Sequence, residues 1–202
     1  LYNNNLGKPV AGAVFDITEK GDTLRWQAIK ADSANRFLTR QWQAIARGNT
    51  FGNPNRVDRG TGYIYLTYAS PKEQSAILNI RGNSGVYFNG IPHMGDPYNS
   101  GFMHIPVSLK KGMNELFVRG TNISADLIFP GKAVSLASDD LTLPSVIKGK
   151  DNSNLEAAIV VINTSSKTLS TLQLKSSIGG KEIKSTLPPV PPMTTRKVKF
   201  RF

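Results

Sequence analysis

The chain contains no cysteine among its 202 residues, and it has only two histidines. The absence of cysteine excludes disulfides, thiolate metal sites and cysteine nucleophiles. Acidic residues are also few, 14 against 25 lysines and arginines. Most of them lie in sequence contexts typical of turns, which Asp and Glu occupy for reasons of local hydrogen bonding. A paired-carboxylate hydrolase centre therefore has few candidate residues.

Motifs for catalysis and cofactor binding are missing as well. The stretch 82–85 lacks the second spacer of the G-x-S-x-G nucleophile elbow, and we expect it to be a turn. Lys132 is followed by alanine, not by the Ser or Thr of a phosphate-binding loop. Neither His93 nor His104 has carboxylates at metal-ligand spacing. We therefore predict a chain with no enzyme activity, no bound metal and no cofactor.

Long hydrophobic runs are absent too. No segment reaches the roughly 18 consecutive apolar residues that a membrane span requires. The 18 glycines and 12 prolines are concentrated between short apolar runs, which is typical of short strands joined by tight turns. The segment 37–45 fits a short helix and a strand equally well. These patterns predict an all-β chain without a membrane span.

The formal net charge of +11 is large for this length. Such an excess raises the expectation of a polyanionic partner. However, the basic residues are spread over both halves of the chain. The densest cluster, 196–202, alternates, with Val198, Phe200 and Phe202 on one face. This is the pattern of a half-buried strand with a solvated outer face. We therefore favour a solvated surface, and no nucleic-acid partner is expected.

Two consecutive hairpin signals carry a resemblance to a known family. The stretch 85–93 contains Asn89-Gly90, the strongest two-residue hairpin signal. The stretch 106–118 reads Pro-Val-Ser-Leu-Lys-Lys-Gly-Met-Asn-Glu-Leu-Phe-Val. Together they resemble the V-x-x-N-G and L-K-x-G-x-N-x-L-x-V hairpins of jelly-roll modules at the front of family 2 glycoside hydrolases and related multidomain bacterial hydrolases. The resemblance covers about residues 60–119, and it implies a scaffold, not a catalytic centre.

The composition changes near residues 130–132, beyond which there is no Tyr, Trp or His. The later segment contains a nearly continuous apolar run at 155–163 and strand patterns every eight to twelve residues. This spacing is typical of an immunoglobulin-like or fibronectin-like sandwich. We therefore expect two consecutive β-sandwiches, a jelly-roll-like one over residues 1–131 and an immunoglobulin-like one over 132–202.

Two polar loops are the candidates for ligand binding. Sugar rings stack on exposed aromatic side chains, while polar side chains bind their hydroxyls. Loops on a β-sandwich often carry function because the sheets hold them in place. By contrast, we expect Trp26, Tyr63 and Tyr65 in the core. The candidate ligand-binding residues are Phe51, Asn55, Arg56, Asp58 and Arg59 in the first loop and His93, Asp96 and Tyr98 in the second.

These observations favour a non-catalytic accessory module of a larger exported bacterial hydrolase, with a periplasmic, cell-surface or secreted location. The chain begins with Leu1 and not with Met, as a mature or excised piece would. The expected partner is the neighbouring catalytic domain of the same polypeptide, with glycan as a candidate ligand. Two alternatives stay open. One is an adhesion or assembly module that binds protein through a strand edge or an aromatic loop, and the other is a polyanion-binding module.

Overall fold

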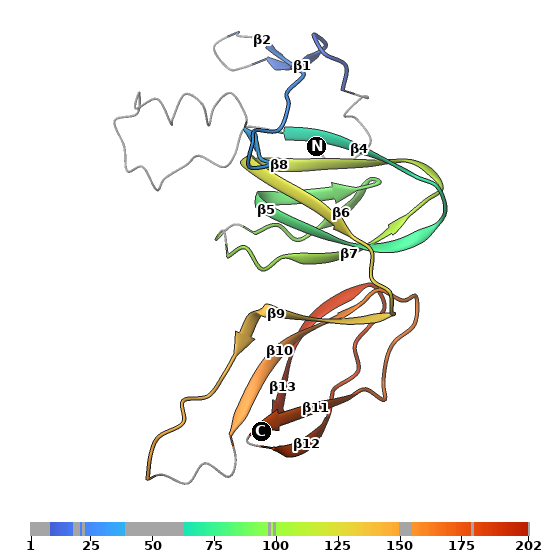
Figure 1. Ribbon diagram of the computed structural model, residues 1–202. Coiled ribbons are helices and arrows are strands. Elements are labelled where there is room, and N and C mark those ends of the chain that lie inside the picture. Colours follow the sequence, from blue (N-terminus) through green and yellow to red (C-terminus); the bar gives the residue numbers. More distant parts are fainter. Residues whose placement is uncertain are drawn as a thin grey trace. The chain divides into compact units, whose positions relative to one another are not determined.

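The structure is a computed structural model, and it describes residues 9–17, 21, 23–38, 63–96, 98, 100–149, 155–178 and 180–201. Within these ranges all the regular elements are β-strands, which form several antiparallel sheets in a sandwich-like arrangement (Figure 1). The predicted all-β fold class is confirmed. The described ranges also hold no helix with the length and apolar character that crossing a membrane would need.

The strands vary from two to seventeen residues in length. In chain order they are β1 (Val14–Ile17), β2 (Thr23–Arg25), β3 (Phe37–Leu38), β4 (Tyr63–Ser70), β5 (Gln74–Phe88), β6 (Ile91–His93), β7 (His104–Leu109), β8 (Gly112–Ile128), β9 (Val134–Thr142), β10 (Glu156–Asn163), β11 (Gln173–Ile178), β12 (Lys181–Thr186) and β13 (Thr194–Arg201). The largest sheet has the order β3-β8-β5-β6, with β4 paired to β8 and β7 paired to β5. The others are β1-β2, β13-β10-β9 and β11-β12.

The chain divides into two compact units. The first unit comprises residues 1–72, 80–103 and 110–126, and the second comprises 73–79, 104–109 and 127–202. The strands β5 and β8 each contribute residues to both units. The predicted boundary between residues 131 and 132 stays a prediction.

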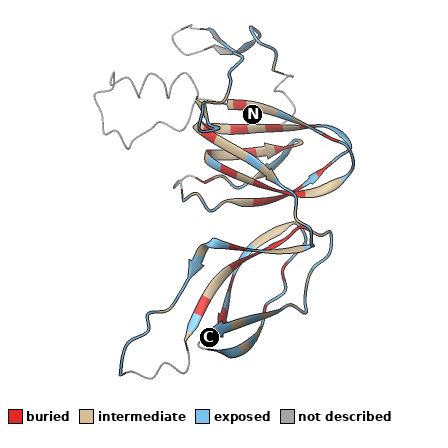
Figure 2. Ribbon diagram, viewed as in Figure 1, coloured by how far each residue is buried: buried red, intermediate tan, exposed pale blue. Residues whose placement is uncertain are grey.

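The core of the first unit lies on the inner faces of β4, β5 and β8. Strand β4 pairs with β8 over its whole length, from Tyr63 opposite Arg119 to Ser70 opposite Gly112. Side chains alternate between the two faces of a strand, and Figure 2 shows buried positions recurring along these strands. The buried apolar residues of this unit are Ile64, Ile80, Val86, Phe88, Leu116, Val118 and Ile123.

The predicted Asn-Gly hairpin is present between β5 and β6. Phe88 pairs with Ile91, and the two turn residues Asn89 and Gly90 have φ angles of 49° and 80°. Positive φ at both central residues is the signature of a type I′ turn, which matches the twist of the flanking strands. The second predicted turn, at 110–112, is also confirmed, because β7 ends at residue 109 and β8 begins at residue 112. The hairpin predicted there is wrong, because β7 pairs with β5 whereas β8 pairs with β4.

Two asparagine side chains connect the turns at residues 89–90 and 110–112. Asn114 is 1% exposed, and its Nδ2 donates to the carbonyl oxygens of Lys110 at 2.9 Å and Gly112 at 3.0 Å. Its Oδ1 accepts from the Lys110 N–H at 3.0 Å and from Asn89 Nδ2 at 2.8 Å. Because buried amides are costly unless their hydrogen bonds are made, Asn89 and Asn114 hold the scaffold together.

The predicted turn at residues 82–85 is wrong, because β5 runs through these residues without a break. Gly82 has a φ of +74°, and a Cβ there would lie 1.8 Å from the carbonyl oxygen of Asn122 in β8. A glycine is therefore required where the two strands approach closely. The sequence shows the glycine but not the neighbouring strand that keeps it within the sheet.

Strand β10 in the second unit is buried on both faces. On one face Val160 and Ile162 pack with Ile77 and Ala137. Val161, which points to the other face, belongs to a second cluster. This double burial explains the continuous apolar sequence predicted for a sandwich core. The residues of the second cluster are Val161, Leu187, Val190 and Val198, with Val134, Ile159, Leu172 and Leu174 packed against it.

The basic C-terminal strand β13 has the predicted alternation. Val198 and Phe200 are buried, and Lys197, Lys199 and Arg201 on the opposite face are exposed. Lys197 Nζ lies 2.6 Å from Asp140 Oδ1, and Lys199 Nζ lies 3.3 Å from Glu156 Oε2. Part of the positive charge therefore lies beside carboxylates on the same unit, on a solvated face.

Candidate functional site

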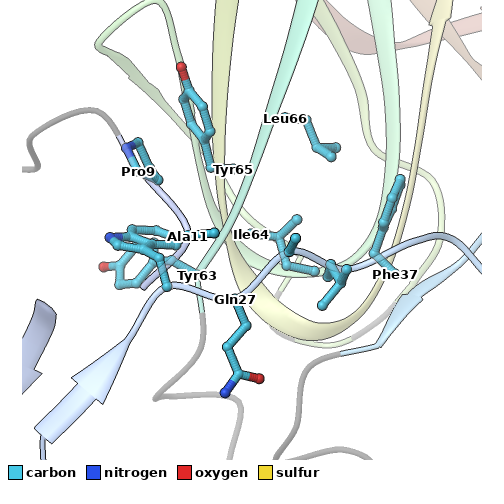
Figure 3. Close-up of a pocket in the computed structure, with 11 residues that line it drawn as sticks. Pro9, Ala11, Gln27, Phe37, Tyr63, Ile64, Tyr65 and Leu66 are labelled. Carbon is cyan, nitrogen blue, oxygen red and sulfur yellow. The ribbon is translucent and has the colours of Figure 1, made fainter. Parts of the chain in front are cut away.

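An aromatic pocket of about 250 Å³ lies in the first unit beside β4 (Figure 3). Four of its lining residues are consecutive in β4, and the others come from the segment after β2, from residues 9–11 and from β3. Its aromatic rings are Trp26, Phe37, Tyr63 and Tyr65, and its remaining lining residues are Pro9, Ala11, Gln27, Ala28, Ile29, Ile64 and Leu66. We call this the aromatic pocket.

Residues from both faces of β4 line the pocket. Ile64 is buried, whereas Tyr63 and Tyr65 on the opposite face are half-buried. Trp26 is also half-buried. Its backbone N–H donates to Ala13 at 3.0 Å, and its carbonyl oxygen accepts from Gly12 at 2.8 Å. The aromatic residues that we expected in the core thus line a pocket.

Phe117 in β8 pairs with two of these rings. It lies directly opposite Tyr65 in the β4–β8 register, with the ring centroids 4.7 Å apart and the planes inclined by 46°. The centroid of Trp26 lies 6.5 Å from that of Phe117 in an edge arrangement. Aromatic pairs in this range contribute roughly 0.5–1.5 kcal/mol each beyond the area they bury. Phe117 therefore packs with one ring from β4 and with one ring from the segment that follows β2.

The hydroxyl of Tyr65 is held by a carboxylate. It donates to Oε1 of Glu115 at 2.8 Å. Burial, and then this hydrogen bond and the negative charge of Glu115, raise the pKa of Tyr65 to about 12. The phenol therefore stays neutral throughout the physiological range.

Among the described residues that line the aromatic pocket there is no Asp, Glu, Lys, Arg or His. This is unexpected for a chain with a net charge of +11. The side-chain amide of Gln27 is exposed at its border, and in the view of Figure 3 it points the opposite way from the Tyr65 hydroxyl. These described lining residues offer a charged ligand no counter-ion, and their rings offer an apolar surface.

Metal binding has no support in the part of the chain that the structure describes. No group of three or more His, Asp or Glu side chains there could hold an ion. His104 Nε2 lies 2.8 Å from Asp139 Oδ2, which is an isolated pair.

The predicted residues of the first loop lie outside the described residues. They are Phe51, Asn55, Arg56, Asp58 and Arg59. Their predicted role in binding stays a prediction.

In the second loop, Asp96 closes the loop on itself. It is 4% exposed, and its carboxylate accepts from the Ser100 N–H at 2.9 Å, the Ser100 hydroxyl at 3.1 Å and the Gly101 N–H at 2.8 Å. Its own N–H donates to the carbonyl oxygen of Asn83 at 3.1 Å. These bonds use much of the acceptor capacity of the carboxylate within the loop, and the predicted role of Asp96 in binding stays a prediction.

The other two predicted residues of this loop differ in environment. Tyr98 is 91% exposed, whereas His93 is half-buried and burial lowers its pKa. None of His93, Asp96 and Tyr98 lines the aromatic pocket. The sequence signal for that pocket was two tyrosines on one face of a strand, and it could not be distinguished from a core pattern.

Comparisons with known proteins identify a distant similarity of fold. No family model matches the sequence, and no curated protein matches it. Among solved structures, the chain is similar to the GH2 beta-galacturonidase from Eisenbergiella tayi, whose crystal structure has galacturonate bound. The sequence identity is 16% and the TM-score is 0.37; the match covers 68% of this chain and 28% of that chain. This similarity concerns the fold alone.

Proposed function

We propose that the chain is a non-catalytic accessory module of a larger exported bacterial hydrolase, and that its aromatic pocket contacts a neutral glycan. The observation that carries this proposal is that the described lining has no charged side chain and presents four half-buried rings, Trp26, Phe37, Tyr63 and Tyr65. A pyranose has apolar C–H faces that stack on aromatic rings, and its hydroxyls bind amide and hydroxyl groups. The exposed Gln27 at the border supplies such a group.

The size of the pocket limits the ligand. Its volume of about 250 Å³ lies just below the roughly 300–1,000 Å³ of pockets that enclose drug-sized molecules. One sugar ring fits that space better than several consecutive rings do. The proposed ligand is therefore a single residue or one end of a neutral oligosaccharide.

The two turn motifs, at residues 89–90 and 110–112, support the accessory part of the proposal. Their asparagines, Asn89 and Asn114, bond to each other and to the backbone of the scaffold. That use agrees with the scaffold role that the resemblance implies. In this proposal the module is exported with its parent protein and positions the neighbouring catalytic domain.

Charge favours a neutral glycan over a polyanion. The described residues that line the pocket include no cation, and Lys197 and Lys199 on the basic strand lie beside carboxylates. A polyanion site would gather unpaired cations and would lose affinity steeply with salt. Binding in the aromatic pocket should instead be insensitive to salt.

Calorimetric titration with a panel of neutral mono- and oligosaccharides tests the proposal. We expect binding by at least one neutral sugar, with equal affinity at about 50 and 200 mM salt. Tyr63→Ala should weaken it about tenfold, because a stacked ring contributes up to about 1.5 kcal/mol. Tyr98→Ala, a ring outside the pocket, is the matched control and should change nothing.

Three results would overturn the proposal. Failure of all neutral sugars to bind would remove the glycan ligand. Loss of affinity in Tyr98→Ala but not in Tyr63→Ala would move the site to the second loop. Hydrolysis of a glycoside by the purified chain, abolished by changing one named side chain, would contradict the non-catalytic role.

A further inference from the structure

We infer that Glu115 is a positioning residue of the aromatic pocket, which fixes the ring of Tyr65 in its wall and is itself held in place by Asn89. The effect on ligand affinity rests on the proposed function, but the effect on Tyr65 does not. The inference assigns the Asn-Gly hairpin a role in the pocket, although the sequence motif implies only a scaffold.

The first step is the fixation of Glu115 by Asn89. The backbone N–H of Asn89 donates to the carbonyl oxygen of Glu115 at 2.8 Å. In the opposite direction, the backbone N–H of Glu115 donates to Asn89 Oδ1 at 2.9 Å. Asn89 Nδ2 is anchored to the buried Asn114. The N–H and the carbonyl oxygen of Glu115 are thus both hydrogen-bonded to Asn89. These two bonds fix the backbone from which the Glu115 side chain extends.

The second step is the fixation of Tyr65 by Glu115. Glu115 and Phe117 are two residues apart in β8, so their side chains share the face on which Tyr65 lies. The Glu115 carboxylate accepts from the Tyr65 hydroxyl at 2.8 Å, and Phe117 contacts the Tyr65 ring. The tyrosine is therefore held at both ends of its side chain. Hydrogen bonds to an ionised acceptor are roughly twice as strong as neutral ones.

Glu115 acts through Tyr65 and not by touching the ligand, because it is not among the residues that line the pocket. A ring that is already held loses less rotational freedom when a ligand stacks on it. Pre-organisation of one such side chain corresponds to roughly three- to tenfold in affinity. Without Glu115, Tyr65 would have to be ordered at the moment of binding.

The test uses two variants of Glu115 that differ in one property. Glu115→Gln keeps an oxygen acceptor for the Tyr65 hydroxyl and removes the charge, whereas Glu115→Leu removes both. Tyrosine ionisation, followed by ultraviolet absorbance during an alkaline titration, reports on Tyr65 without any ligand. The transition that Tyr65→Phe removes belongs to this residue.

We expect the ionisation of Tyr65 to occur at lower pH in both variants, because both lose the negative charge of Glu115. Affinity for the neutral sugar found by calorimetry should fall roughly three- to tenfold in Glu115→Leu and stay within about twofold in Glu115→Gln. Tyr65→Phe should lose as much as Glu115→Leu, and the double variant should lose no more than either, since both remove the same contact.

Unchanged ionisation of Tyr65 in both variants would overturn the inference, whether or not a sugar binds. Additive losses in the double variant would also overturn it. If no neutral sugar binds but Tyr65 ionisation shifts as expected, the proposed function fails and the positioning of Tyr65 by Glu115 stands. The variant Asn89→Gly allows the same positive φ and removes the side-chain oxygen that accepts from the Glu115 N–H. If Tyr65 ionises at the same pH in this variant as in the parent chain, the role of Asn89 is overturned.

Discussion

The close approach of β5 and β8 allows the structure to be tested by adding one methyl group. In Gly82→Ala the new Cβ would lie 1.8 Å from the carbonyl oxygen of Asn122 and 2.8 Å from its carbonyl carbon. Both are backbone atoms, so no side-chain rotation relieves the contact and the strands must separate. Overpacking of this kind costs about 1–3 kcal/mol. The φ of +74° adds about 1–2 kcal/mol for an alanine in the left-handed region.

The matched control is Gly90→Ala in the hairpin turn. Gly90 has a similar φ of +80°, but no atom lies within 4 Å of the position its Cβ would take. It should therefore lose only the conformational part, about 1–2 kcal/mol. The difference between the two variants isolates the steric contact, and we expect Gly82→Ala to be less stable by about 1–3 kcal/mol.

Urea denaturation followed by circular dichroism measures both free energies of unfolding. Equal slopes with denaturant would show that the midpoints report stability alone. A loss of this size is a large fraction of the roughly 5–15 kcal/mol that stabilises a typical domain. If the two variants agreed within about 0.5 kcal/mol, the approach of β5 to β8 at Gly82 would be refuted.

Three further predictions concern buried polar groups. Asn114→Asp removes the donor facing the carbonyl oxygen of Lys110 and should lower the free energy of unfolding, measured by urea denaturation, by about 1–3 kcal/mol. The control Met113→Ala changes an exposed neighbour and should lower it by less than about 0.5 kcal/mol. Equal losses in the two variants would contradict the role of Asn114. Burial lowers the pKa of His93 below 6.5, so its contribution to stability is complete above pH 6.5 and is lost as the pH falls. His93→Gln should therefore lose less stability than the parent chain between pH 8 and pH 5. If the difference in urea midpoint between these two pH values is the same in both proteins, the reasoning is wrong. The pKa of Tyr65 is raised from 10.0 to about 12, so its contribution to stability is complete below pH 10 and is lost as the pH rises to 12. The urea midpoint of Tyr65→Phe should therefore fall less over that interval than the midpoint of the parent chain. An equal fall in the two proteins would refute the assignment.

Strands with regular alternation and turns with specific dipeptides were predictable from the sequence. The exposed and buried residues of β13 follow the pattern read from 197–201, and Phe202 lies outside the described residues. The Asn89-Gly90 turn has the backbone that its residues favour. Both depend on interactions between neighbours in the chain. Strand β9, by contrast, was not predicted. Its register with β10 shifts between Ala137 and Thr142, and Leu136 is half exposed. Its sequence therefore lacks the regular alternation of apolar and polar residues that would have predicted a strand.

The aromatic pocket depended on information that is not local. Tyr63, Tyr65 and Trp26 have the spacing and composition of core residues, and we expected them to be buried. Whether an aromatic face is covered depends on where other segments of the chain lie, which alternation along one strand does not encode. The hydrogen bond between Tyr65 and Glu115 joins residues 50 positions apart, and it could be recognised only once the pairing of β4 with β8 was known.

Polar residue type alone is a poor marker of a binding site in this chain. The amide of Asn163, which begins the sequence Asn-Thr-Ser, is fully buried and donates to the carbonyl oxygens of Lys167, Val190 and Pro191. Asp96 has its carboxylate bound to its own loop. Side chains whose hydrogen bonds are made within the fold have little capacity left for a ligand. The described residues of the pocket beside β4 instead present half-buried rings and no charged side chain. For the proposed neutral sugar, stacking would therefore have to supply most of the affinity, and this is why we propose that holding each ring in place matters.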